Sequence, residues 1–272
     1  MNTALAASPV RSISIGIGGV TLALRSGDGS FRRMVEDRYR DFVRSSSSPQ
    51  IEFDVDLFDF SEAGSSDDHL EVRIHDGNWF LKRGDFQACC NPAAGTGRIR
   101  QSCSPYAVDS LLRIVHSLVL AKQRGFLVHA SSAIRKNRAF IFSGVSGAGK
   151  TTISRLAPPD VTLLTDEISY VRRNGDNYLA CGTPFAGELG RPGANASAPI
   201  SDFYFLEKGP ENRIEPIAAA DAVRRLMRNI LFFVHDPDLV AQVFQSACEF
   251  VSLVPMHRLV FVPDRRVWDI IV

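Results

Sequence analysis

The sequence lacks a dominant charge of either sign, and this limits what the whole chain can attract. Its 31 basic residues are almost balanced by 30 acidic ones, so the net charge is +1 over 272 residues. No global electric field therefore favours nucleic acid or an anionic membrane surface. Any recognition of phosphate has to depend on a local group of residues.

Long apolar runs are also missing. No uninterrupted apolar stretch approaches the roughly 18 residues that a membrane span requires. The N-terminal residues 1–8 have no basic flank and too short an apolar segment for a signal peptide. We expect a cytoplasmic protein that neither enters a membrane nor binds nucleic acid.

Cysteine is scarce and shows no metal-binding or disulfide pattern. The five residues are odd in number and contain no CxxC pair, which favours small buried thiols in a reducing compartment. Cys89 and Cys90 are adjacent, so in a strand they point to opposite faces and do not share a metal.

Residues 1–104 are predicted to be rich in strands. Alternation predicts a hairpin or two short strands over 12–24, and helical periodicity predicts a helix over 31–44. A strand with one acidic face is predicted at 51–57, where alternation explains the carboxylates of Glu52, Asp54 and Asp56 better than a metal site does. A polar loop follows at 61–68, and four further short strands are predicted at 70–75, 79–82, 86–90 and 98–102.

The pattern changes at residue 105. Apolar residues at helical spacing predict an amphipathic linking helix over 105–123, which begins with a proline. Strands and helices then alternate. The expected strands are 126–134, 138–143, 161–165, 168–172, 177–181, 202–207 and 258–262, and the expected helices are 150–157, 218–230 and 238–252. We therefore predict an N-terminal domain over 1–104 and an α/β domain over 105–272.

A glycine-rich loop carries the strongest chemical signal. The apolar strand at 138–143 leads into Gly144-x-x-x-x-Gly149-Lys150-Thr151 and then into a predicted helix, which is the context that a Walker A phosphate loop (P-loop) requires. Glycines allow successive backbone amides to point at phosphate oxygens, Lys150 supplies a cation, and the hydroxyl of Thr151 is a ligand for Mg²⁺. The expected nucleotide-binding residues are Gly144, Ser146, Gly147, Ala148, Gly149, Lys150, Thr151 and Thr152.

Two adjacent carboxylates follow the next strand. Asp166 and Glu167 come only sixteen residues after Lys150, so the intervening helix must be short. Beside Mg·ATP, one carboxylate can hold the metal while the other accepts the proton of an incoming hydroxyl. This pair favours transfer of phosphate to an alcohol over simple hydrolysis.

The order of these residues resembles the catalytic domain of HPr kinase/phosphorylase and its relatives. His129 precedes Gly144 by fifteen residues, and the phosphate loop, short helix and acidic pair follow, so that the resemblance covers residues 124–262 and not 1–104. It implies a phosphate-loop domain with a mixed sheet, of the kind in HPr kinase and phosphoenolpyruvate carboxykinase, preceded here by a smaller strand-rich α+β domain.

The resemblance also implies roles for single residues. Asp166 matches the general base, His129 the residue that supports this base, and Glu167 a magnesium ligand in place of a second aspartate. Thr151 stands where a serine is common. Relatives often form oligomers, so a homo-oligomer is implied as well.

A second loop, over 181–193, is rich in glycine and proline, as loops that close over substrates often are. Glu188 is a candidate to position the acceptor or the metal, and Arg191 to neutralise charge on the transferred phosphoryl group. This stretch matches the HPr kinase pattern only loosely, and a flexible loop with two solvated charges is an equal alternative. Arg224, Arg225 and Arg228, on a predicted helix, are either a solvated face or a surface for an acidic partner.

Together these features predict an ATP- and Mg²⁺-dependent kinase that transfers the γ-phosphate to a hydroxyl. The resemblance implies a serine of a protein or of a ribosomally made peptide as the acceptor. A small-molecule kinase and a non-catalytic ATP-binding sensor or scaffold are the alternatives. A positioned base, Asp166 with His129, distinguishes a kinase from a sensor, because a sensor has no use for one.

Overall fold

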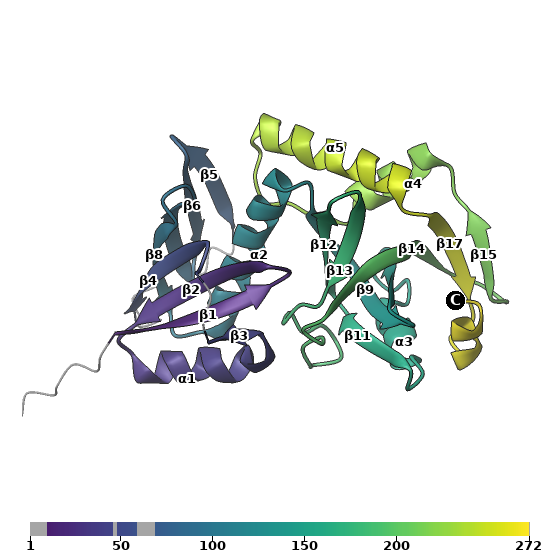
Figure 1. Cartoon of the computed structure of the whole chain (residues 1–272), viewed down its shortest axis with the longest axis horizontal. Coiled ribbons are helices and arrows are strands. Elements are labelled where there is room, and N and C mark those ends of the chain that lie inside the picture. The colour runs from purple at the N-terminus through teal and green to yellow at the C-terminus, as the bar shows by residue number, and fades with distance from the viewer. Residues whose placement is uncertain (1–9, 46–47, 59–68, 272) are drawn as a thin grey trace, which may run out of the picture. The chain divides into compact units, whose positions relative to one another are not determined.

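A computed structural model describes residues 10–45, 48–58 and 69–271 (Figure 1). The predicted polar loop at 61–68 and the N-terminal residues 1–8 lie outside these ranges. The chain forms two compact units. The first comprises the residues up to Ile114 together with Phe233–Asp236, and the second comprises Val115–Phe232 and the residues from Pro237 onward. Each unit is built on its own mixed sheet.

The first unit contains an eight-stranded sheet in the order β3-β1-β2-β4-β8-β7-β6-β5. Strand β2 pairs in parallel with β4 and β4 with β8, while the remaining neighbours are antiparallel. The predicted hairpin and five further strands are confirmed. The strands are β1 (Arg11–Ile17), β2 (Val20–Ser26), β3 (Val43–Arg44), β4 (Ile51–Phe58), β5 (Glu71–His75), β6 (Asn78–Arg83), β7 (Phe86–Asn91) and β8 (Thr96–Ser102).

The predicted helix over 31–44 is shorter than its periodicity suggested. Helix α1 spans Gly29–Arg38 and is capped by Asp28, whose carboxylate accepts a hydrogen bond from the Phe31 amide at 2.7 Å. Tyr39 then leaves the helix, and its buried hydroxyl donates to Asp109 Oδ1 at 2.5 Å. The last two residues of the predicted helix instead form β3, which pairs with β1. Tertiary contacts therefore override the helical pattern here.

Helix α2 (Pro105–Lys122) confirms the predicted linking helix and contributes to both units. In the first unit its Asp109 accepts hydrogen bonds from Tyr39 and from Arg38, and the bond from Arg38 raises the pKa of the Arg38 guanidinium. In the second unit its His116 is fully buried, with Nδ1 3.3 Å from the Tyr170 hydroxyl. The predicted boundary between 104 and 105 lies at the start of α2, and the units divide inside it.

The second unit contains a nine-stranded sheet whose main path is β10-β9-β12-β13-β14-β17-β15. Strand β10 also pairs with β14, so five of the strands close into a ring, and β11 and β16 each pair with β9. The strands are β9 (Phe126–Arg135), β10 (Arg138–Ser143), β11 (Val161–Thr165), β12 (Ile168–Asn174), β13 (Asn177–Cys181), β14 (Ser197–Lys208), β15 (Arg213–Pro216), β16 (Ile230–Leu231) and β17 (Met256–Phe261).

Strands β10 and β14 are buried on both faces. Ile141 belongs to one apolar cluster, which includes residues of helices α4 (Ala219–Met227) and α5 (Pro237–Leu253). The alternate residues Phe140 and Phe142 belong to a second cluster on the opposite face. Such two-sided burial explains the continuous apolar run of the strand that precedes the glycine-rich loop.

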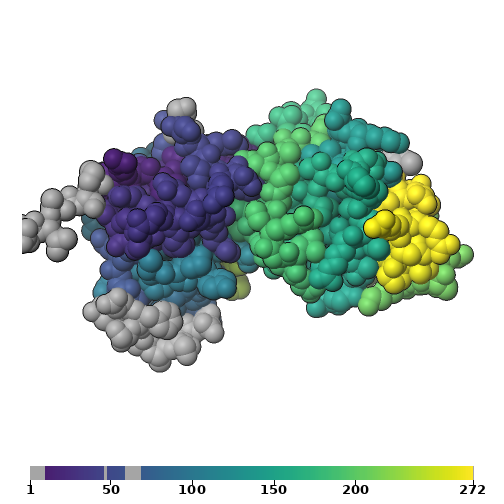
Figure 2. Space-filling model, turned by 90° about the horizontal axis from the view of Figure 1, so that it is seen from below, coloured from purple at the N-terminus to yellow at the C-terminus, as the bar shows by residue number. Residues whose placement is uncertain are grey.

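The C-terminal segment supports helix α3 (Lys150–Arg155), which follows that loop. Trp268, in the 3₁₀ helix η3 (Arg265–Asp269), is buried and donates its indole N–H to the Ile153 carbonyl at 3.1 Å. Arg135 Nη1 donates to the carbonyls of Trp268 and Ile271 at 2.6 and 2.9 Å. Figure 2 shows this segment, in yellow, at the surface of the second unit.

Three features of the second unit differ from the predictions. Strand β15 was not predicted, β14 is longer than expected, and the predicted helix 218–230 ends at Met227 because Ile230 pairs with Val128 as part of β16.

The predicted burial of all the thiols is wrong, since Cys89 and Cys103 are exposed. Cys90, adjacent to Cys89, is buried, which confirms that the two point to opposite faces. No helix in the described ranges is long and apolar enough to cross a membrane.

Candidate functional site

The glycine-rich loop joins β10 to α3 as predicted, and its glycines adopt conformations that other residues rarely take. Gly147 and Gly149 have φ values of +77° and +112°. A Cβ at Gly149 would lie 2.6 Å from the Phe261 ring, whereas one at Gly147 would meet nothing within 4 Å. The loop is therefore packed against β17 on one side and open on the other, with Ser146 and Gly147 exposed. An open face of this kind leaves room for a phosphate chain.

Lys150 begins α3 and folds back over the loop. Its side chain is mostly buried, and Nζ donates to the Gly144 carbonyl at 2.9 Å and approaches the Val145 carbonyl at 3.4 Å. Burial lowers the pKa of the Lys150 amine, while the carboxylates of Glu167 and Glu188 act in the opposite direction. An ammonium group has three N–H donors, so this lysine can contact an anion while it keeps its hydrogen bonds to the loop carbonyls.

The acidic pair stands at a sharp turn between β11 and β12. The pairing of β11 with β9 is irregular between Leu163 and Thr165. The Thr165 hydroxyl accepts from the amides of Glu167 and Ile168 at 3.1 and 3.2 Å, which fixes the turn that follows. Asp166 is only 6% exposed, whereas Glu167 is half-buried. The two neighbours thus have different environments.

The loop over 182–193 contacts this pair directly. The Gly187 amide donates to Asp166 Oδ1 at 3.0 Å, and the Leu189 amide donates to Oδ2 at 2.9 Å. A Cβ at Gly187 would lie 2.7 Å from Glu167 Oε2 and 2.8 Å from Asp166 Oδ2. Only a glycine allows the backbone to approach both carboxylates so closely. The predicted loop therefore lies over the acidic pair, and we call it the carboxylate loop.

Backbone hydrogen bonds and close packing hold the base of the carboxylate loop. The Thr183 amide donates to the Leu164 carbonyl at 3.1 Å, and the Ala194 amide donates to the Leu163 carbonyl at 2.9 Å. Phe185 and Thr183 are fully buried. Both ends of the loop are thus joined to β11, the strand that carries Asp166.

A family model described as "SynChlorMet cassette protein ScmC" matches residues 104–271. The chain belongs to the ScmC family. The matched region of this ScmC-family chain starts one residue before α2 and includes the glycine-rich loop, the acidic pair and the carboxylate loop. Among solved structures, the Hpr(Ser) kinase/phosphatase from Coxiella burnetii is 14% identical over 44% of this chain and 87% of that one, with a TM-score of 0.26. No curated protein matches the sequence.

The remaining predicted site residues of the ScmC-family chain are less closely grouped. Glu188 has a side chain that is 75% exposed, and its carboxylate lies 4.0 Å from Arg155 of α3. Arg191 is exposed on the carboxylate loop. His129 is opposite Ile168 in the pairing of β9 with β12, one residue beyond Glu167, and its carbonyl accepts from the Ser143 hydroxyl at 3.0 Å.

Of the three oxygen ligands predicted for magnesium, Thr151 and Glu167 are half-buried at the loop and the turn, whereas Glu188 is exposed on the carboxylate loop. Mg²⁺ takes one or two protein oxygens together with phosphates and water, which suits the Thr151 hydroxyl and the Glu167 carboxylate. Within the described ranges no cluster of three or more His, Cys, Asp or Glu side chains could hold a metal by itself.

Sequence patterns missed the amide contacts to Asp166, because hydrogen bonds between Asp166 and residues 187–189 leave no periodic signal. Gly187, a glycine within the predicted loop, was the sequence signal that could have indicated these contacts.

The predicted helix with three arginines has a simpler outcome. Arg224 and Arg225 both pair with Asp221 in α4, and Arg225 also donates to Glu207 at 2.8 Å. Two of its three arginines are thus held by local carboxylates.

Proposed function

We propose that this chain is a Mg²⁺-dependent phosphotransferase that moves the γ-phosphate of ATP to a hydroxyl, most simply a serine of a protein or a ribosomally made peptide. The observation that carries the proposal is the grouping of the phosphate-loop lysine with the acidic turn. The carboxylates of Glu167 and Glu188 oppose the lowering of the Lys150 pKa by burial, and the Gly187 amide, beside Glu188 on the loop, donates to Asp166. Phosphate binding and proton acceptance are thereby combined in one small region.

The residues divide the work as follows. The loop amides and Lys150 bind the β- and γ-phosphates of ATP, and the Thr151 hydroxyl and Glu167 would hold Mg²⁺, which neutralises phosphate charge when bound. Asp166 orients the acceptor hydroxyl and takes its proton. Two hydrogen bonds from loop amides orient the Asp166 carboxylate, and phosphoryl transfer depends more on such positioning than on a strong base.

The carboxylate loop would control how an acceptor hydroxyl reaches Asp166. Both Asp166 oxygens bind loop amides, so an acceptor hydroxyl must share or displace at least one of these bonds. Glu188 and Arg191 lie on the same loop, and its movement would carry both of them. Arg191 is the one cation within residues 182–193, and it would neutralise negative charge on the transferred phosphoryl group.

The test is transfer of label from γ-labelled ATP, with Mg²⁺, into proteins, peptides and small alcohols. Lys150→Ala should lose ATP binding and transfer, whereas Asp166→Asn should keep ATP binding and lose transfer by at least about a hundredfold. Lys208→Ala and Asp176→Asn are matched controls, because both side chains are exposed and lie outside the site.

Two outcomes would contradict the proposal. If Asp166→Asn loses binding and transfer together, Asp166 supports the fold and is not the base. If ATP binds the unaltered chain but no acceptor of any class is labelled, the chain is a nucleotide sensor and not a kinase.

A further inference from the structure

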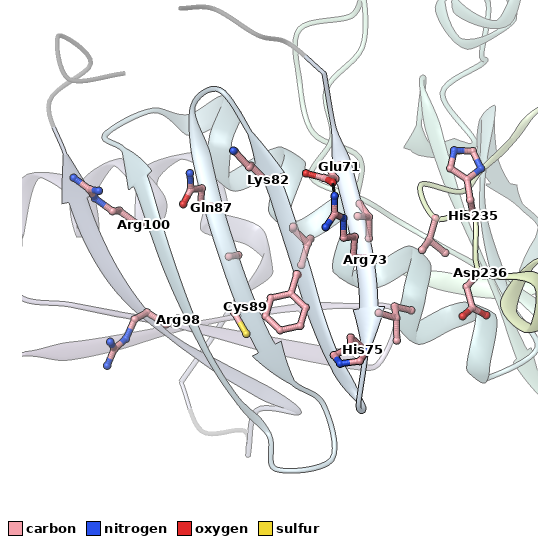
Figure 3. A pocket seen from close by; sticks show the side chains of 16 residues that line it. Glu71, Arg73, His75, Lys82, Gln87, Cys89, Arg98, Arg100, His235 and Asp236 are labelled. Carbon is pink, nitrogen blue, oxygen red and sulfur yellow. Dashed lines mark ion pairs between the residues drawn. The ribbon is translucent and has the colours of Figure 1, made fainter. Parts of the chain in front are cut away.

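A large cavity lies in the first unit, and its strand residues, from 71 to 100, belong to the part of the chain that the resemblance to HPr kinase does not cover. It has a volume of about 910 Å³ and is lined by strands β5, β6, β7 and β8 and by residues 234–236 (Figure 3). We call it the β5 groove. None of its lining residues belongs to the phosphate-loop site.

The floor of the β5 groove is the outer face of the sheet. Register places Arg73, Phe80, Cys89 and Arg98 in one row across the four strands. The adjacent row contains Glu71, Lys82, Gln87 and Arg100. Phe80 is 42% exposed, so this floor combines apolar surface with charged side chains.

The lining has an excess of positive charge. Its cations are Arg73, Lys82, Arg98 and Arg100, and its carboxylates are Glu71 and Asp236. Arg98 and Arg100 stand opposite Asp54 and Asp56 of β4, so Arg73 and Lys82 are the cations that remain for a ligand at the β5 end of the sheet. Glu71 forms an ion pair with Arg73, and that Arg73 side chain is still 75% exposed. A groove with this balance, in a chain whose net charge is only +1, is complementary to a ligand with several negative charges.

A free strand edge borders the groove. Strand β5 is the last strand of the sheet, and in the described part of the chain it pairs only with β6. Its other edge therefore presents backbone N–H and C=O groups to the groove, with His235 and Asp236 on the far side (Figure 3). Backbone groups in this arrangement bind another extended chain through strand addition.

The two faces of β5 differ, and this specifies the sequence pattern of such a chain. Glu71, Arg73 and His75 face the charged floor, whereas Val72 and Ile74 alternate with them and line the groove together with the buried Val234. An added strand would place alternate side chains toward cations and toward apolar groups. We propose that the β5 groove binds an extended acidic peptide, with acidic and aliphatic residues in alternation, as an additional strand beside β5.

Binding is measured without nucleotide, so this proposal does not depend on phosphoryl transfer. The probe is a fluorescein-labelled peptide of alternating Glu and Val, about nine residues long so that it extends past both ends of β5. Its anisotropy is followed on titration with the full-length chain. We expect saturable binding that weakens as ionic strength rises from about 0.05 to about 0.5 M.

Charge reversal tests the cations. The double variant Arg73→Glu/Lys82→Glu should bind the probe about tenfold more weakly, since both side chains are at the surface and each reversal replaces attraction by repulsion. Arg11→Glu/Arg33→Glu is the matched control, because these exposed arginines lie outside the groove and the control should bind normally. Thermal melts of both variants verify that they fold. Equal binding by the groove variant and the control would overturn the proposal.

Two further measurements test the position and the mode of binding. The probe should slow amide hydrogen exchange in β5, the strand with which it pairs, and leave exchange in β3, at the opposite end of the sheet, unchanged. A probe N-methylated at alternate residues should bind about tenfold more weakly, because it loses strand hydrogen bonds. Undiminished binding by that probe, or equal binding by an oligothymidylate of the same charge, would show a purely electrostatic surface and refute strand addition.

Discussion

The two sheets of the chain present their strands to ligands in different ways. In the first unit, β5 to β8 expose one face and one edge, and the charged residues of the β5 groove project from regular strands. In the second unit, β10 and β14 are buried on both faces, and the candidate chemistry lies in turns and loops at their ends. The comparison teaches that a free strand edge suits docking of an extended chain, while loops at strand ends can bring several backbone amides to one ligand.

The largest expected effect tests this difference in burial. Phe140 is fully buried between strands and the C-terminal segment, so Phe140→Ala should lower the free energy of unfolding by about 4 kcal/mol. Phe80 is 42% exposed, and Phe80→Ala should cost less than about 1 kcal/mol. Urea unfolding of both variants measures the two values. Similar losses would mean that the outer face of the first sheet is covered in solution.

A second pair of variants tests the carboxylate loop. A Cβ at Gly193 would lie 1.6 Å from the Leu164 carbonyl oxygen, so Gly193→Ala should cost about 3 kcal/mol or free the loop from β11. At Gly190, where φ is +66° and nothing lies within 4 Å, alanine should cost about 1 kcal/mol, the strain of a left-handed conformation. Thermal unfolding together with limited proteolysis separates the two results. Equal tolerance at both positions would show that the loop base is not fixed.

The smallest effect sharpens the comparison within α2, which contributes the buried Asp109 to the first unit and the buried His116 to the second. Burial lowers the pKa of His116 to about 3, against about 6.5 in an unfolded chain. Between these values the unfolded state binds the proton and the folded state does not, so stability falls as pH decreases. From pH 6.5 to pH 5 the loss should be about 2 kcal/mol.

Urea titrations at several pH values measure this slope, with His116→Gln as the comparison. The variant should lose most of the dependence in that range. If the unaltered chain and the variant have the same slope, another group is responsible for it.

Local patterns made the phosphate loop and most elements predictable. The loop is specified by residues within eight positions of each other, and the apolar strand before it and the helix after it have clear periodicities. The pair Asp166 and Glu167 was also visible, because it follows a short apolar strand. The short helix that their spacing demanded is present as α3.

Longer-range features were not predictable in the same way. Strand β3 takes residues 43–44 from a helical pattern because they pair with β1, and β16 takes residues 230–231 in the same manner through β9. Strand β15 contains alternating charges and a terminal proline, which give little strand signal. The amide bonds to Asp166 join residues more than twenty positions apart and depend on how the carboxylate loop folds back.

The division of α2 has a consequence for any attempt to transplant the ScmC-matched module. A fragment starting at residue 104 keeps the whole helix, yet it leaves Val108, Leu111 and Leu112, all fully buried in the intact chain, on a part of the helix assigned to the first unit. A fragment starting at residue 115 avoids that surface but begins in mid-helix, one residue before His116. We therefore expect a fragment cut at residue 104 to expose apolar surface on the first turns of α2, which polar substitutions there would reduce.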